Sequence, residues 1–395
     1  MFKVNKGAFI ILGSVFFSAL FIGGTFFYGI FFFILFLLLL CSYMGKKVYK
    51  SMECLVWKVS DSVTSGDYID YSIEIYNSSM FPIPYMEVYA NIPERLTGEQ
   101  EKFNVISLSP GGKIKLSKSF TCKHKGIYDL GSIDVIYGDP FFIFSWRKQI
   151  KYDISLIVHP KIYPIENVFI PANQIFGTIS QKNNAFEDFT SIKDIRKYQK
   201  GDSFKKIHWK VSAHKGDLYV KNLDMNASTH MHLFLDLYED KYLCDRREDI
   251  EERASECAAS LINFAMSKAI GVNLYAAAKE YINLSHKEAG TLETYLDVLA
   301  NLNSEGTINI SQIIYKESQK LNSGVTIIII TPKVDTDLIS TASQMKLKGF
   351  KFVIFEIKDE NMISDEMGKF IPEDIGYIQI PLDDEGHIFV RDIYA

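Results

Sequence analysis

The sequence predicts an α+β multidomain protein that combines a transmembrane helical hairpin, a β-sandwich and a doubly wound α/β domain. Three observations predict it: an uncharged apolar run near the start, then apolar residues alternating at a period of two, and finally short apolar strands alternating with helical stretches. With 395 residues, 47% of them hydrophobic, the chain is long enough for two or three cores. The predicted parts are residues 1–44 (hairpin), 45–160 (β-sandwich), 161–225 (signature segment) and 226–395 (α/β domain).

Residues 7–44 contain no charged side chain and predict two membrane-spanning helices. A single helix would be roughly 57 Å long at ~1.5 Å per residue, against a hydrocarbon core of ~30 Å. The glycine pair at residues 23–24 offers a turn, which divides the run into helices over residues 7–22 and 26–44. A cleaved signal peptide is the alternative, but residues 31–40 are bulky throughout and offer no small-residue cleavage site.

The residues that flank the hairpin predict its orientation. Five lysines and no acidic residue lie among the first fifty residues, at positions 3, 6, 46, 47 and 50. The positive-inside rule therefore predicts a protein of the cell membrane with two spans and both termini in the cytoplasm. The five cysteines form no CxxC pair, which is typical of isolated thiols in a reducing compartment.

After the hairpin, apolar and polar residues alternate over residues 69–75, 86–92 and 114–122. This period predicts half-buried strands, and Gly, Pro, Asn and Ser clusters between them predict turns. The spacing is that of a small antiparallel sandwich of the immunoglobulin-like kind. No catalytic constellation is visible in it, so we expect a structural or docking role.

From residue 230 onward, strands and helices alternate, as in a doubly wound α/β domain. The clearest helix is predicted over residues 246–269, where apolar residues recur on one face and Gly271 follows as a stop. The remaining predicted strands cover residues 230–237, 272–278, 325–331 and 351–357, and the remaining helices cover residues 292–302, 311–321 and 336–348.

The segment between the two domains is unusually rich in charged, aromatic and glycine residues. Its special residues are Arg196, Tyr198, Gly201, Asp202, His208, Trp209, Lys210, Ser212 and Lys221. Their spacing resembles the signature of the bacterial family catalogued as domain of unknown function 58. The upstream motifs are similar to that family too: Gly126-x-Tyr128-x-Leu130-Gly131, Asp139-Pro140-Phe141 and Val158-x-Pro160.

The resemblance implies a von Willebrand factor A-like α/β domain and genes often found beside a MoxR-type AAA+ ATPase and transglutaminase-like membrane proteins. It implies no settled biochemical activity. The chain departs from the family where Lys205, Lys206 and His214 stand in place of arginines. Lysine keeps the charge but lacks the planar fork that binds carboxylate or phosphate with two hydrogen bonds.

Two interpretations of the signature segment remain open. In the first, Arg196, Asp202 and Lys210 form charge-assisted bonds that fix the segment against the α/β sheet, as a buried polar staple. In the second, the segment is a surface that a partner protein recognises, with Trp209 and Arg196 as anchors. The excess of lysine and arginine over acids from residue 193 to 221 suits anionic lipid headgroups as well as nucleic acid. Because no nucleic-acid-binding module is recognisable, we expect no nucleic acid as partner.

The sequence also bears on whether the α/β domain binds a divalent metal ion. The von Willebrand A-like domains that bind Mg²⁺ use an Asp-x-Ser-x-Ser loop after the first strand, and here Asp236 and Asp240 keep oxygen donors while Tyr238 replaces the first serine. A later strand commonly ends in Thr-Asp-Gly, whereas residues 331–333 read Thr-Pro-Lys. We therefore expect a degenerate metal site and no cofactor, with a carboxylate that caps a helix as the plain alternative.

Enzymatic motifs are absent from the sequence: there is no HExxH, GxSxG, Walker A or GxGxxG run. We expect a non-enzymatic, membrane-anchored adaptor that binds protein partners, foremost a MoxR-type AAA+ ATPase, and the lipid bilayer. The alternative is a Mg²⁺-dependent enzyme or metal-switched binder that uses Asp236 and Asp240.

Overall fold

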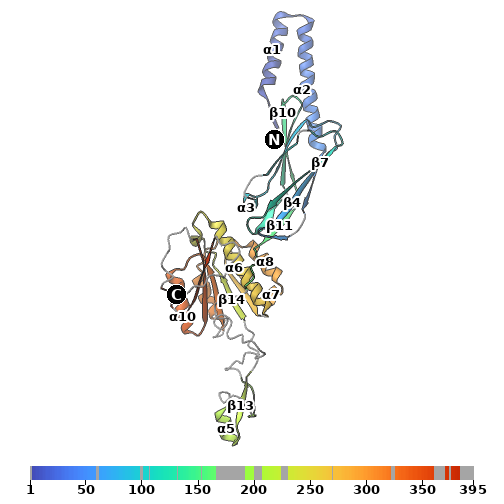
Figure 1. Cartoon of the computed structure of the whole chain (residues 1–395). Helices are drawn as coiled ribbons and strands as arrows, with labels where there is room; N and C mark the ends of the chain where they lie inside the picture. The colour runs from blue at the N-terminus through green and yellow to red at the C-terminus, as the bar shows by residue number, and fades with distance from the viewer. Residues whose placement is uncertain are drawn as a thin grey trace. The chain divides into compact units, whose positions relative to one another are not determined.

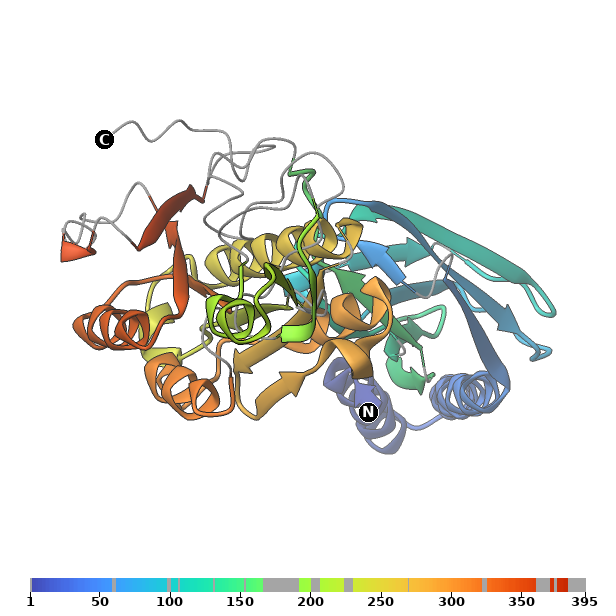
Figure 2. The same ribbon diagram turned by 90° about the horizontal axis from the view of Figure 1, so that it is seen from below.

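The structure, a computed structural model, divides into two compact units. One comprises Met1–Lys161 with Leu296–Leu302, and the other comprises Ile162–Tyr295 with Asn303–Ala395. Figures 1 and 2 show the ribbon from two sides. The residues described are 2–58, 62–97, 101–105, 107–130, 132–152, 154–165, 192–199, 207–223, 230–268, 270–321, 325–359, 370–372 and 375–382.

Two antiparallel helices, α1 (Lys6–Ile22) and α2 (Thr25–Ser51), form the expected hairpin (Figure 1). Asn5 caps α1, since its side-chain oxygen accepts a hydrogen bond from the Gly7 amide at 3.0 Å. The α2 helix is long and apolar enough to cross a membrane, and most of it is not buried by the protein. The α1 helix is also apolar but, at 17 residues, is shorter.

Three sheets make up the rest of the first unit, in the strand orders β1-β10-β9-β5-β6, β2-β4-β7 and β3-β11-β8. Their facing apolar side chains form one core, in which Ile73 and Ile75 of the second sheet join Val88 and Val135 of the first. The elements are β1 (Phe2–Val4), β2 (Met52–Lys58), β3 (Ser62–Thr64), β4 (Tyr68–Asn77), β5 (Tyr85–Ala90), α3 (Glu94–Thr97), β6 (Glu101–Val105), β7 (Lys113–Thr121), β8 (Gly126–Asp129), β9 (Ser132–Gly138), β10 (Phe144–Lys151) and β11 (Ser155–His159).

The hairpin is joined to these sheets at both of its ends. Ahead of α1, strand β1 pairs antiparallel with β10, so that Phe2 lies opposite Trp146. At the other end, the indole of Trp146 lies so close to Gly45 of α2 that a Cβ on Gly45 would come within 2.1 Å of the ring. The Tyr137 hydroxyl donates to the Gly45 carbonyl at 2.9 Å, and its ring stacks on Trp146. The foot of the hairpin is therefore fixed to the sheet by packing and by hydrogen bonds.

A tight turn between β9 and β10 lies beside the start of α1. The buried carboxylate of Asp139 accepts hydrogen bonds from the amides of Phe141 and Phe144, at 2.8 and 2.5 Å. Phe142 has a positive φ of 53°, and both Phe141 and Phe142 are exposed. The Asn5 amide donates to the Ile143 carbonyl at 2.8 Å, which links the turn to the cap of α1.

A six-stranded sheet forms the centre of the α/β domain, in the order β16-β15-β14-β17-β18-β19. All its neighbouring strands are parallel except the edge strand β16, which is antiparallel. The sheet consists of β14 (His230–Leu235), β15 (Gly271–Ala277), β16 (Tyr281–Leu284), β17 (Thr326–Thr331), β18 (Lys351–Lys358) and β19 (Gly376–Pro381). The helical elements along this part of the chain are η2 (Glu239–Tyr242), α6 (Arg247–Ser267), α7 (His286–Ala289), α8 (Leu292–Asn301), α9 (Ile310–Ser318) and α10 (Thr336–Leu347).

Helices lie on both faces of this sheet (Figure 2). On one face, Phe234, Ile327 and Ile329 pack against α9 and α10. Because side chains alternate along a strand, Leu233 and Ile328 point to the opposite face, which α6 covers. Numbered within the sheet, the strand order is 3-2-1-4-5-6, the arrangement in which the winding direction reverses between the first and fourth strands. That reversal falls between β14 and β17.

The signature segment forms a small module of its own, which we call the signature module (residues 192–199 and 207–223). Strand β12 (Ile192–Lys197) pairs antiparallel with β13 (Tyr219–Leu223), and the helix α5 (Trp209–Lys215) lies between them in the chain. Ile207 and Val220 bridge to each other and are buried, so the module has an apolar contact at its centre.

Candidate functional site

The signature residues fall into two sets, one that builds the module and one that lies on its surface. His208 is the N-cap of α5: its ring accepts from the Val211 amide, and its own amide donates to the Tyr219 carbonyl at 2.8 Å. Ser212 is buried and accepts from the Tyr219 amide at 2.9 Å. The Tyr198 amide donates to the Leu218 carbonyl at 2.9 Å. His208 and Ser212 therefore hold α5 against β13, and Tyr198 pairs with the residue that precedes β13.

The surface set includes Trp209, whose exposed indole is the side chain best suited to anchor a binding partner. Trp209 is 66% exposed, and Arg196 and Lys210 are exposed as well. Arg196 donates to the neighbouring Lys197 carbonyl at 3.4 Å, while Lys197 pairs with Asp217 at 2.5 Å. Gly201 and Asp202 lie outside the described residues, and for Lys221 only the backbone pairing with Ile195 is described. Within the signature module, the side chains of Trp209, Arg196 and Lys210 therefore lie on the surface, and both interpretations of the segment remain predictions.

A second group of side chains meets at the end of β14, where the winding of the sheet reverses. Parallel α/β sheets usually bind ligands at this position, outside the carboxyl ends of the strands. Four residues lie together there and are called the switch-point cluster below: Asp236, Lys241, Thr331 and Asp335.

Asp236 is fully buried, and both of its carboxylate oxygens are engaged. Its Oδ1 accepts from the Tyr238 amide at 3.2 Å, and its Oδ2 accepts from the Thr331 hydroxyl at 2.8 Å. The ammonium of Lys241 lies 3.0 Å from the same Oδ2. Tyr242, also buried, donates its hydroxyl to the Asp236 carbonyl at 2.7 Å.

Lys241 joins two loops of the domain. Its Nζ pairs with Asp236 from the loop after β14 and, at 2.8 Å, with Asp335 Oδ2 from the loop after β17. The side chain of Lys241 is only 6% exposed. Burial by itself would lower the pKa of Lys241, but the charges of Asp236 and Asp335 outweigh it and raise that pKa above its ordinary value. The ammonium therefore stays charged at neutral pH.

Asp335 has a second role as the N-cap of α10. Its Oδ1 accepts from the Leu338 amide at 2.7 Å while its Oδ2 faces Lys241. The loop after β17 thus supplies a carboxylate four residues beyond Thr331, just after the Thr-Pro-Lys of residues 331–333. The sequence analysis did not single out Asp335, although an aspartate directly before the helix predicted over residues 336–348 is a favoured N-cap.

Asp240, the second expected metal ligand, has a different partner. Its Oδ2 accepts from the Tyr238 hydroxyl at 2.6 Å, on the exposed side of the loop. The carboxylate that faces Lys241 beside Asp236 is Asp335, not Asp240. Among the residues that the structure describes, no group of three or more His, Cys, Asp or Glu side chains is arranged to hold a metal ion.

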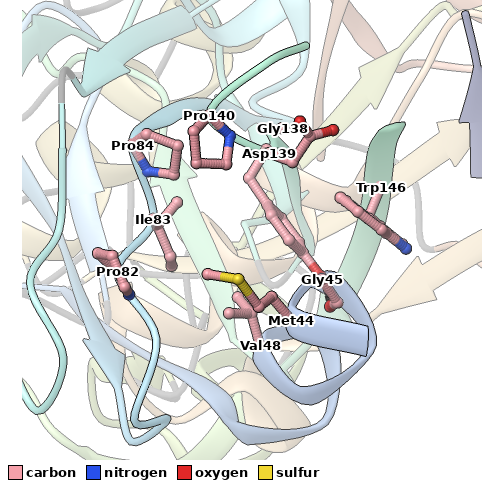
Figure 3. Close-up of a pocket in the computed structure, with 11 residues that line it drawn as sticks. Met44, Gly45, Val48, Pro82, Ile83, Pro84, Gly138, Asp139, Pro140 and Trp146 are labelled. Carbon is pink, nitrogen blue, oxygen red and sulfur yellow. Dashed lines mark hydrogen bonds between the residues drawn. The ribbon is translucent and has the colours of Figure 1, made fainter. Parts of the chain in front are cut away.

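The first unit contains a small pocket at the foot of the hairpin (Figure 3). The end of α2, the loop before β5 and the turn after β9 line it, and its surface is mainly apolar. The one acidic residue in its wall, Asp139, is committed to the amides of Phe141 and Phe144. The lining of this pocket is therefore suited to apolar packing and offers no free catalytic group.

Known proteins resemble parts of this chain. The family described as "Protein of unknown function DUF58" matches residues 194–325. The "Uncharacterized protein YeaD" of Bacillus subtilis is 22% identical over 224 residues, which cover 55% of this chain and 53% of that protein. The chain thus spans about half the length of this curated relative.

Solved structures resemble stretches of about a quarter of the chain. A CARDB domain from Pyrococcus furiosus has a TM-score of 0.20 and 16% identity, and covers 27% of this chain and 86% of its own. The sporulation control protein Spo0M of Bacillus subtilis has a TM-score of 0.17 and 12% identity, with coverages of 28% and 51%. Similarities this slight support no conclusion about the chain. The family resemblance carried by residues 196–221 is confirmed by the family match, and the chain carries a DUF58 segment over residues 194–325.

Proposed function

We propose that this chain is a non-enzymatic, membrane-anchored adaptor that binds protein partners on the cytoplasmic side of the cell membrane. The observation that carries the proposal is the exposed indole of Trp209, presented by a module in which the signature residues His208 and Ser212 hold the shape. Tryptophan and arginine are the residues most enriched at the energetic centres of protein interfaces. A rigid indole with Arg196 and Lys210 nearby in the sequence suits a partner surface with an apolar pocket and acidic residues.

The expected partner is a MoxR-type AAA+ ATPase, as the family resemblance implies. The charge of the module supports an acidic partner surface, because the side chains of Arg196, Lys210 and Lys215 are exposed. Such charges act mainly on the rate of association and on its dependence on salt. The proposal therefore includes binding that weakens as ionic strength rises.

The attachment of both ends of the hairpin to one folded unit supports two spans. Strand β1 precedes α1 and strand β2 follows α2, and both belong to the same compact unit. A chain that leaves that unit and returns to it crosses the bilayer an even number of times. With the lysines at positions 3, 6, 46, 47 and 50, the proposal has both termini in the cytoplasm.

The finer fold assignments belong to the same proposal. The facing sheets of the first unit are consistent with an immunoglobulin-like sandwich, and the mainly parallel six-stranded sheet with helices on both faces is consistent with a von Willebrand factor A-like domain. Both architectures are common as binding modules, which agrees with an adaptor role.

The test is direct binding of the detergent-solubilised full chain to a purified MoxR-type AAA+ ATPase. Trp209→Ala is expected to weaken binding at least tenfold, equivalent to ~1.4 kcal/mol, because an exposed anchor contributes to the interface and not to folding. Arg196→Glu is expected to weaken binding and to reduce its dependence on salt.

The matched control is Leu243→Ala, which removes an apolar side chain that is 74% exposed elsewhere in the same unit. It should bind as the unchanged chain does. Protection of the fully buried Cys257 thiol from alkylation reports that each variant is folded. If the unchanged chain retains no ATPase under mild conditions, the adaptor proposal with this partner fails.

A further inference from the structure

The switch-point cluster raises the question of what occupies the ligand position of the α/β sheet. The position is built by two loops that lie far apart in the sequence, one after β14 and one after β17. It holds two carboxylates, Asp236 and Asp335, and one hydroxyl, Thr331. Carboxylate and hydroxyl oxygens are hard donors, which are the ligands that Mg²⁺ and Ca²⁺ prefer.

The space between the carboxylates is already taken by a cation of the chain itself. Lys241 Nζ lies 3.0 Å from Asp236 Oδ2 and 2.8 Å from Asp335 Oδ2, and its side chain is 6% exposed. A Mg²⁺ ion bound to the same oxygens would need to approach them to ~2.0–2.1 Å, and Ca²⁺ to ~2.3–2.6 Å. Either ion would then overlap the ammonium or lie in direct contact with it, and like charges repel strongly in a buried site.

The donors also have little capacity to spare. Asp236 Oδ2 accepts both the Thr331 hydroxyl and the Lys241 charge, and Oδ1 accepts the Tyr238 amide. Asp335 Oδ1 caps α10. Asp240, which a metal loop would need, is turned to the Tyr238 hydroxyl on the exposed side. The residues therefore do not fit a divalent metal while Lys241 is in place.

We propose that Lys241 is an internal cation that replaces a divalent metal at the switch point, so that the α/β domain holds its two ligand loops together without metal. The ammonium lies between the buried carboxylate of Asp236 and the partly exposed carboxylate of Asp335, and it ties the loop after β14 to the cap of α10. Removal of the ammonium leaves two facing carboxylates and a hydroxyl, the donor set of a divalent-cation site.

The experiment compares divalent-ion binding by the full chain and by variants at position 241. Lys241→Ala removes the ammonium, and Lys241→Gln removes the charge but keeps most of the length. Lys320→Ala is the matched control, because Lys320 also pairs with a carboxylate of the same unit, Glu317, but lies after the end of α9 with a side chain that is 61% exposed. Unfolding of the α/β domain is followed by alkylation of buried Cys257, located by mass spectrometry, as temperature rises with and without Mg²⁺.

The unchanged chain and Lys320→Ala are expected to show no Mg²⁺-dependent shift of the unfolding midpoint. Lys241→Ala is expected to show a saturable rise of roughly 2–4 °C at a Mg²⁺ concentration about five times its Kd. Addition of Asp335→Asn to Lys241→Ala should abolish that rise. Mn²⁺, followed by its electron paramagnetic resonance signal, should be bound by Lys241→Ala and not by the unchanged chain.

Two results would overturn the proposal. One is a Mg²⁺-dependent shift or Mn²⁺ binding in the unchanged chain that Asp236→Asn removes, because the ammonium would then not exclude the metal. The other is a Lys241→Ala or Lys241→Gln variant that protects Cys257 and yet responds to neither ion. The first measurement needs no variant at position 241 to fold.

Discussion

Replacement of Gly45 by alanine tests the contact that fixes the hairpin to the first unit. A Cβ at this position would lie 2.1 Å from two atoms of the Trp146 indole, which is itself almost fully buried and stacked on Tyr137. Because the indole has no free space, Gly45→Ala forces α2 away from the sheet. The same movement lengthens the 2.9 Å hydrogen bond from the Tyr137 hydroxyl to the Gly45 carbonyl.

The magnitude follows from three contributions. Overpacking of a filled core costs roughly 1–3 kcal/mol. Loss of the Tyr137 hydrogen bond costs about 1 kcal/mol. Alanine is the better helix former and returns about 1 kcal/mol. We therefore expect Gly45→Ala to lower the free energy of unfolding of the first unit by roughly 1–3 kcal/mol.

The matched control is Gly29→Ala in the same helix, where a Cβ has no neighbour within 4 Å. That variant should be as stable as the unchanged chain or slightly more stable. Unfolding in urea is followed by alkylation of Cys54 and Cys122, both buried in the first unit, with the protein in lipid nanodiscs. Trp146→Phe removes the ring atoms that meet the new methyl group, so it should cost less in the Gly45→Ala background than alone. Equal stability of Gly45→Ala and Gly29→Ala would refute the reasoning.

Two further predictions concern buried polar groups. Asp139→Ala removes the acceptor of two backbone amides in the turn that carries the positive φ of Phe142. It should lower the free energy of unfolding of the first unit by about 1–3 kcal/mol, measured by alkylation of Cys122 in urea. An unchanged urea midpoint would contradict this. Burial, with a smaller effect of the charge of His230, lowers the pKa of His232 from 6.5 to about 4, so the unfolded chain binds a proton that the folded chain does not as pH falls through this interval. The free energy of unfolding of the α/β domain should therefore fall by up to about 3 kcal/mol between pH 6.5 and pH 4 because of this group. The His232→Phe variant should lose less stability over the same interval, measured by hydrogen exchange of β14 amides in urea. Equal losses would exclude His232 as the cause.

The regular elements were readily predictable because their signal is local. The predicted helix over residues 246–269 is α6 (Arg247–Ser267), and the four predicted strands of the α/β domain agree with β14, β15, β17 and β18 to within two residues. Each of these elements buries a continuous apolar face or run, which fixes its period in the sequence. The strand β1 was missed, because a strand of only three residues ahead of an apolar helix shows no periodicity.

The candidate site was only partly predictable. Asp236 was found because a carboxylate directly after a buried strand is a recognisable pattern. Lys241 and Asp335 were missed as a pair, because the ion pair joins loops from two different strands and no spacing along the chain reveals it. The exposure of Trp209 was equally unpredictable, since composition alone does not distinguish an anchor from a core ring.

The pairing of β1 with β10 has a consequence for the order of events during synthesis. Phe2–Val4 can reach its partner only after Phe144–Lys151 has left the ribosome. At the usual ~5–20 residues per second, that delay is roughly 7–28 s. Both hairpin helices, which end at Ser51, are made well before then, so the hairpin can form before the sheet is complete. With the two spans that we propose, the edge strand would close the first unit only after the hairpin has returned both of its ends to the same side of the membrane. A correctly inserted hairpin would then be a condition for a complete β domain.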